Sequence, residues 1–594
     1  MKKLFSTALI SLATLSIWAQ EVSYNLSMPK PQNHYFNVEM NLQDFSNDYI
    51  DIQMPIWAPG SYLAREFPKN VNLVKAKNQN GKELEVYKTS KNTWRIEKNK
   101  KDDVVVNYEV YAFELSVRTS FLDLTHGYLN GTSVFMYPKG HKDLGGELNI
   151  TPYKDFKKIT TALPKAGDGV ANDNNTQRFT YNNYDHLADC PIEIGNQEEF
   201  SFQAAGVKHN VAIYGEGNYD VEKLKVDMAK IVESATSIFG ENPNKEYWFI
   251  IHNTLNGGGG LEHTNSTTLN VNRWSYEGGA YLGFLSLVAH EYFHLWNVKR
   301  IRPDALGPFN YNEENYTSLL WVMEGFTSYY DELILRRAGF YSEQQYLGRL
   351  KSTLNYVEGS EGNKVQPVAH ASFDAWIKSY RPNENSANTT ISYYSKGNLL
   401  ALVIDAMIID KYQGEKSLDD FMQVLYNKFY KKLNRGFSED EFQAELEDFL
   451  DMDLNEFFRD FVYGVETIPY NKYLSKIGLE VKDASTTTPS FGSSVSEQDG
   501  KLMVRRIRAN SAAEDAGLSV NDEILSINGY RMDAAKFSSF LGTMAPGDSF
   551  TLIVSRDDVL RVLEAKMGEH KQDRYEFVLD TAENSLARYW LRLQ

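Results

Sequence analysis

Two histidines four residues apart, with a glutamate directly after the first, stand in the stretch "LVAHEYFHLWNVKRIRP" at residues 287–303. On an α-helix, residues four apart lie one above the other on the same face, so His290 and His294 can direct both imidazoles toward one point. Glu291 lies beside that face, where it can act as a general base without binding a metal. The spacing therefore predicts a zinc site. The alternative is a pair of histidines buried in an apolar core with their hydrogen bonds satisfied.

A catalytic zinc site needs a third protein ligand, and two later stretches supply candidates. "FNYNEENYT" contains Glu313 and Glu314, whereas "LLWVMEGFTSYYDEL" contains Glu324. Glu324 lies within an apolar helical pattern, where an unpaired carboxylate would be costly, so we expect it to be the ligand. Asp331 follows two helical turns later on the same face. It either accepts a hydrogen bond from a ligand histidine or is an ordinary surface acid.

The hydrophobic pattern along the chain predicts a multidomain protein. Residues 20–205 contain short alternating segments typical of a β-sandwich. Residues 206–472 begin with strands and one helix and continue as a series of helices that end at glycines, which predicts an α+β domain with a mostly helical second half. Residues 473–594 are again mostly strands, followed by a tail.

The N-terminus "MKKLFSTALISLATLSIWAQEVSYN" has two lysines before an apolar run that is shorter than the roughly 20 residues of a membrane span. It predicts a signal peptide over residues 1–19 and therefore an exported bacterial protein, periplasmic or secreted. The alternative is an uncleaved anchor. We expect no transmembrane segment in the mature chain.

Charge and cysteine content exclude some classes of protein. The formal net charge of −17 argues against a nucleic-acid partner, because phosphate binding needs a basic face. With a single cysteine, Cys190, no intramolecular disulfide is possible, and we expect this residue to be small and buried rather than catalytic.

Four stretches, "HEYFHLWNVKRIRP", "WVMEGFTSYY", "GGGGLEH" and "SYYSKG", resemble the glycyl aminopeptidase family of zinc metallopeptidases. These are thermolysin-like gluzincins related to the alanyl aminopeptidases. "MPIWAPGSYLAREF" in the N-terminal part fits the same family. The resemblance implies a thermolysin-like catalytic domain at 206–472 with one Zn²⁺ per chain. It implies that His290, His294 and Glu324 bind the zinc and that Glu291 is the catalytic base.

The segment "GGLEH", Gly259 to His263, resembles the G-x-M-E-N motif of aminopeptidases. In that motif the backbone, here Gly259 and Gly260, lines the cleft, and the glutamate, here Glu262, holds the free amine of the substrate. Leucine and histidine replace the methionine and asparagine of the motif, which leaves strict aminopeptidase specificity open. If the family resemblance is set aside, the four consecutive glycines have two interpretations. They either allow the backbone to approach a substrate closely or form a flexible hairpin loop.

The segment "YSKG" resembles the Y-x-K-G motif, whose tyrosine stabilises the oxyanion of the tetrahedral intermediate. The resemblance assigns this role to Tyr394. The neighbouring Tyr393 is the alternative, because the two tyrosines are consecutive. Loss of one such donor typically slows a reaction by about 10²–10³-fold.

The C-terminal segment resembles a PDZ domain. In "SFGSSV", Phe491, Gly492 and Ser493 stand where a carboxylate-binding loop would present backbone N–H groups. PDZ domains bind extended C-terminal peptides by adding a strand to a sheet edge, so a C-terminal peptide is a possible ligand. The alternative is that the domain only packs against the catalytic domain.

Together these features predict an exported zinc aminopeptidase that acts on peptide substrates. The resemblance implies a preference for small N-terminal residues, Gly or Ala. One alternative is a zinc endopeptidase that recruits proteins through its PDZ domain. Another is an inactive peptide-binding scaffold, against which the intact set of ligands and Glu291 argues.

Overall fold

The computed structural model describes residues 20–170, 175–580 and 584–592. The predicted signal peptide at 1–19 lies outside the described residues. The chain forms two compact units: the first runs to Ile56 and resumes at Glu66–Asn196, and the second combines Trp57–Arg65 with the chain from Gln197 onward. Within the described ranges, no helix is long and apolar enough to cross a membrane.

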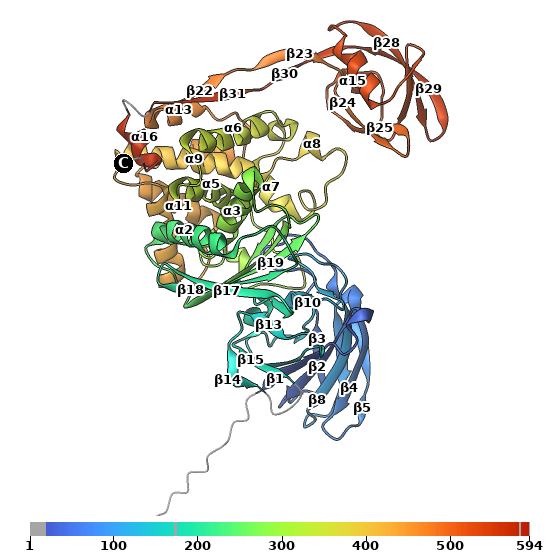
Figure 1. Cartoon of the computed structure of the whole chain (residues 1–594), viewed down its shortest axis with the longest axis vertical. Coiled ribbons are helices and arrows are strands. Elements are labelled where there is room, and N and C mark those ends of the chain that lie inside the picture. Colours follow the sequence, from blue (N-terminus) through green and yellow to red (C-terminus); the bar gives the residue numbers. More distant parts are fainter. Residues whose placement is uncertain (1–19, 171–174, 581–583, 593–594) are drawn as a thin grey trace, which may run out of the picture. The chain divides into compact units, whose positions relative to one another are not determined.

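The first unit is rich in β-structure, as predicted, and its largest sheet has the strand order β14-β15-β12-β1-β2-β8-β4-β5 (Figure 1). Two four-stranded sheets, β13-β16-β10-β9 and β11-β3-β7-β6, complete it. Alternate residues of β1 and β2 are buried, which is the period of a strand with one face on a core. The elements are β1 (Glu21–Ser27), β2 (Tyr35–Gln43), β3 (Tyr49–Gln53), β4 (Val71–Asn78), β5 (Glu83–Leu84), β6 (Val86–Ser90), β7 (Thr93–Glu97), β8 (Val104–Tyr111), β9 (Phe121–Leu122), β10 (Gly127–Leu129), β11 (Tyr137–Pro138), β12 (Gly146–Thr151), β13 (Lys158–Thr161), β14 (Lys165–Val170), β15 (Gln177–Tyr181), α1 (Tyr184–Ala188) and β16 (Ile192–Gly195).

The second unit begins with a five-stranded sheet of order β17-β18-β19-β21-β20. Its strands are β17 (Glu198–Ala204), β18 (Val207–Tyr214), β19 (Glu246–Thr254), β20 (Gly260–Glu262) and β21 (Ser266–Asn272). The short strand β20 lies at the edge of the sheet and pairs antiparallel with β21. The predicted GGLEH segment therefore runs along a sheet edge.

Helices pack in layers beyond this sheet. The helices α2 (Val221–Phe239) and α3 (Gly278–Phe293) lie against the sheet, α5 (Gly325–Arg337) packs on α3, and α9 (Tyr393–Lys411) packs on α5 (Figure 1). The remaining helices of this part are α4 (Leu320–Met323), α6 (Glu343–Glu358), α7 (Val368–Phe373), α8 (Ser386–Thr389), α10 (Leu418–Leu425), α11 (Glu439–Leu450), α12 (Asn455–Phe457) and α13 (Tyr470–Leu474).

Serine residues cap the starts of several helices. Ser342 and Ser438 each form a capping box at the start of α6 and α11, and at the start of α10 the N–H of Ser417 donates to the Asp420 carboxylate at 2.9 Å. The reciprocal bonds satisfy backbone N–H groups that have no partner inside the helix. At the other end of α2, Gly240 adopts the left-handed conformation that stops the helix.

One predicted helix is interrupted. The apolar pattern of residues 316–339 predicts a continuous helix, but the structure has two, α4 and α5, with Glu324 at the junction. The side-chain amide of Asn297 donates hydrogen bonds to the carbonyl oxygens of Val322 and Met323, at 3.0 and 2.9 Å. Because these carbonyls would otherwise serve the helix, the break follows from a side chain outside the segment.

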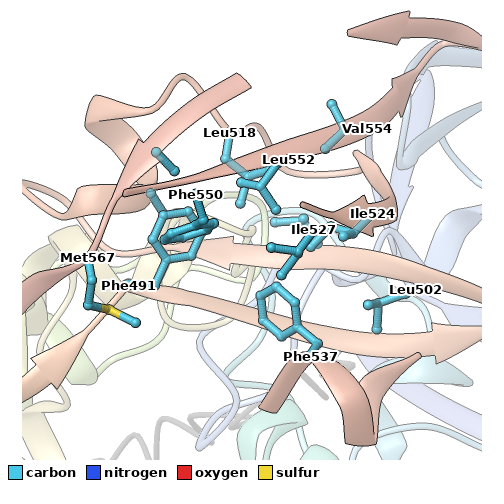
Figure 2. Packing of buried hydrophobic residues seen from close by; sticks show 13 residues of the cluster. Phe491, Leu502, Leu518, Ile524, Ile527, Phe537, Phe550, Leu552, Val554 and Met567 are labelled. Atoms are coloured by element: carbon cyan, nitrogen blue, oxygen red, sulfur yellow. The ribbon is translucent and has the colours of Figure 1, made fainter. Parts of the chain in front are cut away.

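The PDZ fold closes the second unit. Its sheet has the order β24-β25-β26-β28-β29, and Figure 2 shows buried side chains such as Phe491, Ile527 and Phe550 gathered in one apolar core with Phe537. The elements are β24 (Ser493–Gln498), β25 (Lys501–Ile507), α14 (Ala512–Asp515), β26 (Glu523–Ile527), β27 (Tyr530–Arg531), α15 (Ala534–Gly542), β28 (Ser549–Arg556) and β29 (Val559–Lys566).

A two-stranded ribbon carries the chain into this fold and back again. The strands β22 (Leu479–Asp483) and β23 (Thr486–Ser490) pair antiparallel with β31 (Tyr575–Leu579) and β30 (Gly568–Gln572), respectively. The chain then forms α16 (Ser585–Trp590), in which the Trp590 indole donates to the Tyr329 hydroxyl of α5 at 2.8 Å. The C-terminal tail is thus a helix that packs against α5 and α9.

Candidate metal centre

The structure brings His290, His294 and Glu324 together. Nε2 of each histidine lies close to Oε2 of Glu324, at 3.4 Å for His290 and 3.2 Å for His294. The three residues offer ligand atoms that all lie within 4.8 Å of one another. His294 caps the end of α3, and its N–H still bonds the His290 carbonyl, so the four-residue helical spacing holds. Two imidazoles and a carboxylate are the donor set of a catalytic zinc site.

Each imidazole is oriented through its other nitrogen. Nδ1 of His294 lies 2.8 Å from the carbonyl oxygen of Asn297, and Nδ1 of His290 lies 2.9 Å from Oδ2 of Asp331. A carbonyl oxygen only accepts, so Nδ1 of His294 carries the proton and Nε2 is left as the ligand atom. Asp331 gives His290 the same orientation in the manner of a carboxylate–histidine–metal triad. The structure thus places Asp331 beside a ligand, the first of the two roles considered for it.

Asn297 is a residue that sequence reasoning missed. Its side chain is fully buried and braces the break before α5, with a further bond to the Thr327 hydroxyl at 3.1 Å. Its backbone fixes His294, so one residue positions both a ligand histidine and the segment that carries Glu324. The only signal in the sequence is its place three residues after His294, in a stretch that would otherwise continue the helix.

The charges at this centre are those expected of a cation site. Burial lowers the pKa of His290, but hydrogen bonds with Asp331 and Glu324 outweigh it and raise the pKa well above its usual value. Burial raises the pKa of Glu324, but His294 and His290 hold it at about 2. The negative surroundings that favour protons on both imidazoles equally favour a divalent cation in place of those protons. The donor set and its field therefore fit a bound metal ion.

Glu291 lies beside this cluster without joining the ligand set of His290, His294 and Glu324. It is buried, and burial raises its pKa to about 7. Among the described residues, its Oε2 has no hydrogen-bond partner. Gly260 makes room for it, because a Cβ at that position would lie 2.4 Å from the Glu291 side chain. The second glycine of GGLEH is thus required because the backbone at residue 260 lies close to the Glu291 side chain.

Glu262 faces the same centre from the edge strand β20. It is buried, and one of its carboxylate oxygens lies within 4.8 Å of ligand atoms of Glu291 and His294. By contrast, Glu313 is exposed and accepts a hydrogen bond from Asn310, and among the described residues neither it nor Glu314 joins a metal-binding group.

A second contribution missed by sequence reasoning comes from Trp57–Arg65. These residues belong to the second unit although they follow β3 of the first. A Cβ at Gly60, which has φ +82°, would lie 2.5 Å from Oε1 of Glu262. The hydroxyl of Tyr62 is buried without a hydrogen-bond partner among the described residues, and the charges of Glu324 and Glu262 add to burial in raising its pKa. The two prolines and the glycine of "MPIWAPGSYLAREF" are typical of a turn and give no sign of this contact.

Tyr394 completes the centre from the first turn of α9. Its ring stacks on the imidazole of His290 at a centroid distance of 6.2 Å. The neighbouring Tyr393 is more deeply buried and stacks against Tyr394 at 4.7 Å. Burial and the nearby Glu324 raise the pKa of Tyr394 well above its usual value, so its hydroxyl stays protonated as a donor. Of the two tyrosines, Tyr394 is the one next to the ligand set.

Comparison with protein families agrees with this geometry. Residues 23–196 match the Peptidase M61 N-terminal domain, residues 283–400 match M61 glycyl aminopeptidase, and residues 489–567 match a PDZ domain. The central match includes His290, His294, Glu324 and Tyr394. Among curated protein sequences, none matches the chain.

Solved structures show the same architecture. A crystal structure of an aminopeptidase N family protein from Idiomarina loihiensis is 32% identical, covers 96% of this chain and 100% of that chain, and has a TM-score of 0.88. An M1 zinc metallopeptidase from Deinococcus radiodurans, solved as a mutant bound to a Tyr-Ser-Ala substrate, is 12% identical and covers 76% of this chain and 94% of that chain, with a TM-score of 0.51. The second likeness concerns the fold alone.

Proposed function

Because the chain belongs to the glycyl aminopeptidase family of zinc metallopeptidases, we propose that it is an exported aminopeptidase that removes small N-terminal residues, Gly or Ala, from peptides. The observation that carries the proposal is the position of Glu262. A buried carboxylate so close to the ligand atoms of the metal centre supplies a partner for a substrate ammonium group, and an endopeptidase has no use for one there.

His290, His294 and Glu324 would hold one zinc ion per chain. When bound, zinc supplies Lewis acidity toward a peptide carbonyl and a nearby water molecule. Glu291 accepts the proton of the attacking water and passes it to the leaving amine, and burial, which raises the pKa of this carboxyl group, favours its role as the proton acceptor. Tyr394 donates a hydrogen bond to the oxyanion that forms on the scissile carbonyl.

A narrow pocket beside Glu262 supports the preference for small residues. It has a volume of about 10 Å³ and is lined by Trp57, Gly60, Tyr62 and Phe309 among others. A cavity must have roughly 10–15 Å³ of this kind to hold one water molecule. The pocket therefore admits little more than a methyl group.

The amine partner is tested with matched peptides. The wild-type enzyme should cleave Gly-Ala-Ala and fail on its N-acetylated form. Glu262→Gln should lower kcat/KM for the free-amine peptide by roughly 10- to 150-fold, the range expected of a charge-assisted hydrogen bond, and leave zinc content unchanged. If the wild-type enzyme cleaves free-amine and N-acetylated peptides equally well, the aminopeptidase hypothesis is ruled out and the endopeptidase alternative is favoured.

The pocket is tested with a series of N-terminal residues. On Gly-, Ala-, Leu- and Phe-anilides, kcat/KM should fall by at least about tenfold between Ala and Leu, because a longer side chain must displace the pocket walls. Comparable rates on Gly and Phe would contradict the preference for small residues.

Export rests on the N-terminal sequence alone. Fractionation of the native cells, with N-terminal sequencing of the mature protein, tests it. A mature chain that begins near Gln20 outside the cytoplasm is the expected result, and an intact Met1 on cytoplasmic protein would contradict it.

A further inference from the structure

A cavity with a volume of about 1030 Å³ is built by two distant parts of the second unit. One wall comes from the start of α9, including Ser392, Tyr393 and Tyr394. The other comes from the carboxylate-binding loop of the PDZ fold, including Phe491, Gly492 and Ser493. This volume lies at the upper end of the roughly 300–1,000 Å³ typical of pockets that hold a drug-sized ligand, so a peptide of a few residues fits.

The two walls are held together by one side chain. Asn388 in α8 donates from its Nδ2 to the carbonyl oxygen of Ile507 at 2.9 Å, and its Oδ1 accepts from the N–H of Ala509 at 3.0 Å. Both partners flank Arg508. The amide thus bonds to the PDZ backbone on either side of a residue that lines the cavity.

The charge of the cavity favours an anion. Its lining contains three cations, Lys378, Arg506 and Arg508, and one anion, Glu361. Lys378 pairs with Asp374 at 2.9 Å, but Arg508 has no carboxylate partner among the described residues. The Arg508 guanidinium donates to the hydroxyl of Ser490 at 3.1 Å, and partial burial lowers its pKa. A positive lining stands out in a chain with a net charge of −17.

The lining of the same cavity also contains a buried hydroxyl group. Oγ of Ser493 is shielded from solvent and has no hydrogen-bond partner within the described part of the chain. A buried polar atom without a partner is costly unless a ligand or water satisfies it. A guanidinium without a carboxylate partner and a hydroxyl without a hydrogen-bond partner together suit a carboxylate ligand.

We propose that this cavity binds the C-terminal half of the peptide substrate, with the terminal carboxylate at Arg508 and Ser493. The inference rests on the proposed function. Tyr394 stacks on His290 and also lines the cavity, so substrate residues on the leaving-group side of the scissile bond enter this space. The enzyme then binds both ends of a short peptide, the N-terminal ammonium group at Glu262 and the C-terminal carboxylate at the PDZ loop.

The alternative occupant is the C-terminus of a separate protein. The strand β24 lies at the edge of its sheet, so a peptide can pair with it in the usual PDZ manner. Such a ligand would bind whether or not its N-terminus is free. A substrate that spans both sites needs both ends free.

Steady-state kinetics tests the proposal. We expect the wild-type enzyme to prefer Gly-Ala-Ala over its C-terminal amide by about tenfold or more in kcat/KM, and Arg508→Gln to bring this ratio close to one. Arg561→Gln, which removes an exposed arginine of the same fold outside the cavity, should keep the wild-type ratio. A wild-type ratio near one, or an unchanged ratio in Arg508→Gln, would overturn the proposal. If Arg508→Gln does not fold, Ser493→Ala should lower the ratio in the same direction.

Two further measurements separate this proposal from the proposed function. Glycine anilide has no amino-acid residue beyond the scissile bond, so its cleavage tests the aminopeptidase without the cavity. If the wild-type enzyme cleaves glycine anilide but cleaves Gly-Ala-Ala and its C-terminal amide with equal kcat/KM, the role of the cavity is overturned while the aminopeptidase stands. Binding to the Glu291→Gln variant by calorimetry needs no turnover. The free-amine peptide acid should bind about tenfold or more tightly than its amide and than its N-acetylated form. Equal affinity of the N-acetylated acid would mean that the cavity holds detached C-termini.

Discussion

At the scale of single residues, the centre separates groups that face a metal from groups that face a substrate. Nε2 of both His290 and His294 faces Oε2 of Glu324, and Nδ1 of each histidine has a neighbouring acceptor. Glu291 instead keeps a buried oxygen without a hydrogen-bond partner among the described residues. That difference distinguishes the proposed base from the proposed ligands although all four side chains lie together.

The first prediction concerns Glu291. Glu291→Gln should retain zinc and lose at least about 10²-fold in kcat, because the amide keeps the size of the side chain but cannot accept the proton of water. Elemental analysis and steady-state kinetics on the same preparation measure both quantities. A variant that keeps more than a few percent of the wild-type kcat would show that another group is the base.

The second prediction concerns the third ligand. Glu324→Ala should purify without zinc, because the two histidines alone leave the site a ligand short. Glu313→Ala is the matched control, since it removes an exposed glutamate in the neighbouring loop and should keep the metal. A zinc-free Glu313→Ala protein beside a zinc-replete Glu324→Ala protein would reverse the assignment.

At the scale of elements, the α4–α5 junction, which carries Glu324, and α9, which carries Tyr394, approach each other closely. A Cβ at Gly325 would lie 2.4 Å from Cα of Gly397, and a Cβ at Gly397 would lie 2.3 Å from the carbonyl oxygen of Trp321. Two glycines therefore allow α9 to approach the α4–α5 junction. The contact brings the first turn of α9, with Tyr394, to the metal ligands.

The third prediction concerns the brace at the same junction. Asn297→Ala should lower the free energy of unfolding by about 2–4 kcal/mol, because two buried carbonyls lose their donor. Zinc affinity should fall by roughly 10- to 100-fold through the displaced His294 and Glu324. Asn297→Asp keeps the size of the side chain but not the donor, so it should share both defects. Chemical denaturation and chelator competition test this, and a normal zinc affinity in both variants would contradict the role of the brace.

At the scale of the whole molecule, the PDZ fold is an insertion between two elements that belong to the catalytic part. The chain leaves through β22 and returns through β31, and these strands pair with each other. The returning chain ends in α16, whose buried Trp590 reaches the hydroxyl of Tyr329, which in turn donates to Asp405 at 2.6 Å. The last helix therefore supports α5, the helix of Asp331.

The fourth prediction separates these two parts. Replacing residues 486–572 by a short turn should leave glycine-anilide hydrolysis nearly intact, because the ribbon start and α16 remain. Truncation after residue 580 should instead destabilise the enzyme by about 3–5 kcal/mol, the usual cost of losing a buried tryptophan. Thermal denaturation and anilide kinetics on both variants measure the difference. A large loss of anilide activity in the first variant, with its fold intact, would mean that the PDZ fold builds the catalytic cleft itself.

The sequence by itself determined what depends on local geometry. Helical periodicity puts His290 and His294 on one face and Glu291 beside it, and serine caps and glycines mark several helix ends, because these effects act over a few residues. The apolar surroundings of Glu324 were enough to favour it over Glu313. The alternation of apolar and polar residues likewise predicted the β-rich N-terminal unit, and the resemblance supplied Glu262 and Tyr394.

Only the tertiary structure decided what depends on distant segments meeting. Nothing local predicts that Asn297 interrupts a helix that starts more than twenty residues later, or that Gly60 approaches Glu262 across about two hundred residues. The same holds for the PDZ loop, which shares a cavity with Tyr394. Such contacts are fixed by packing, which joins residues according to the shape of the folded core rather than their order in the chain.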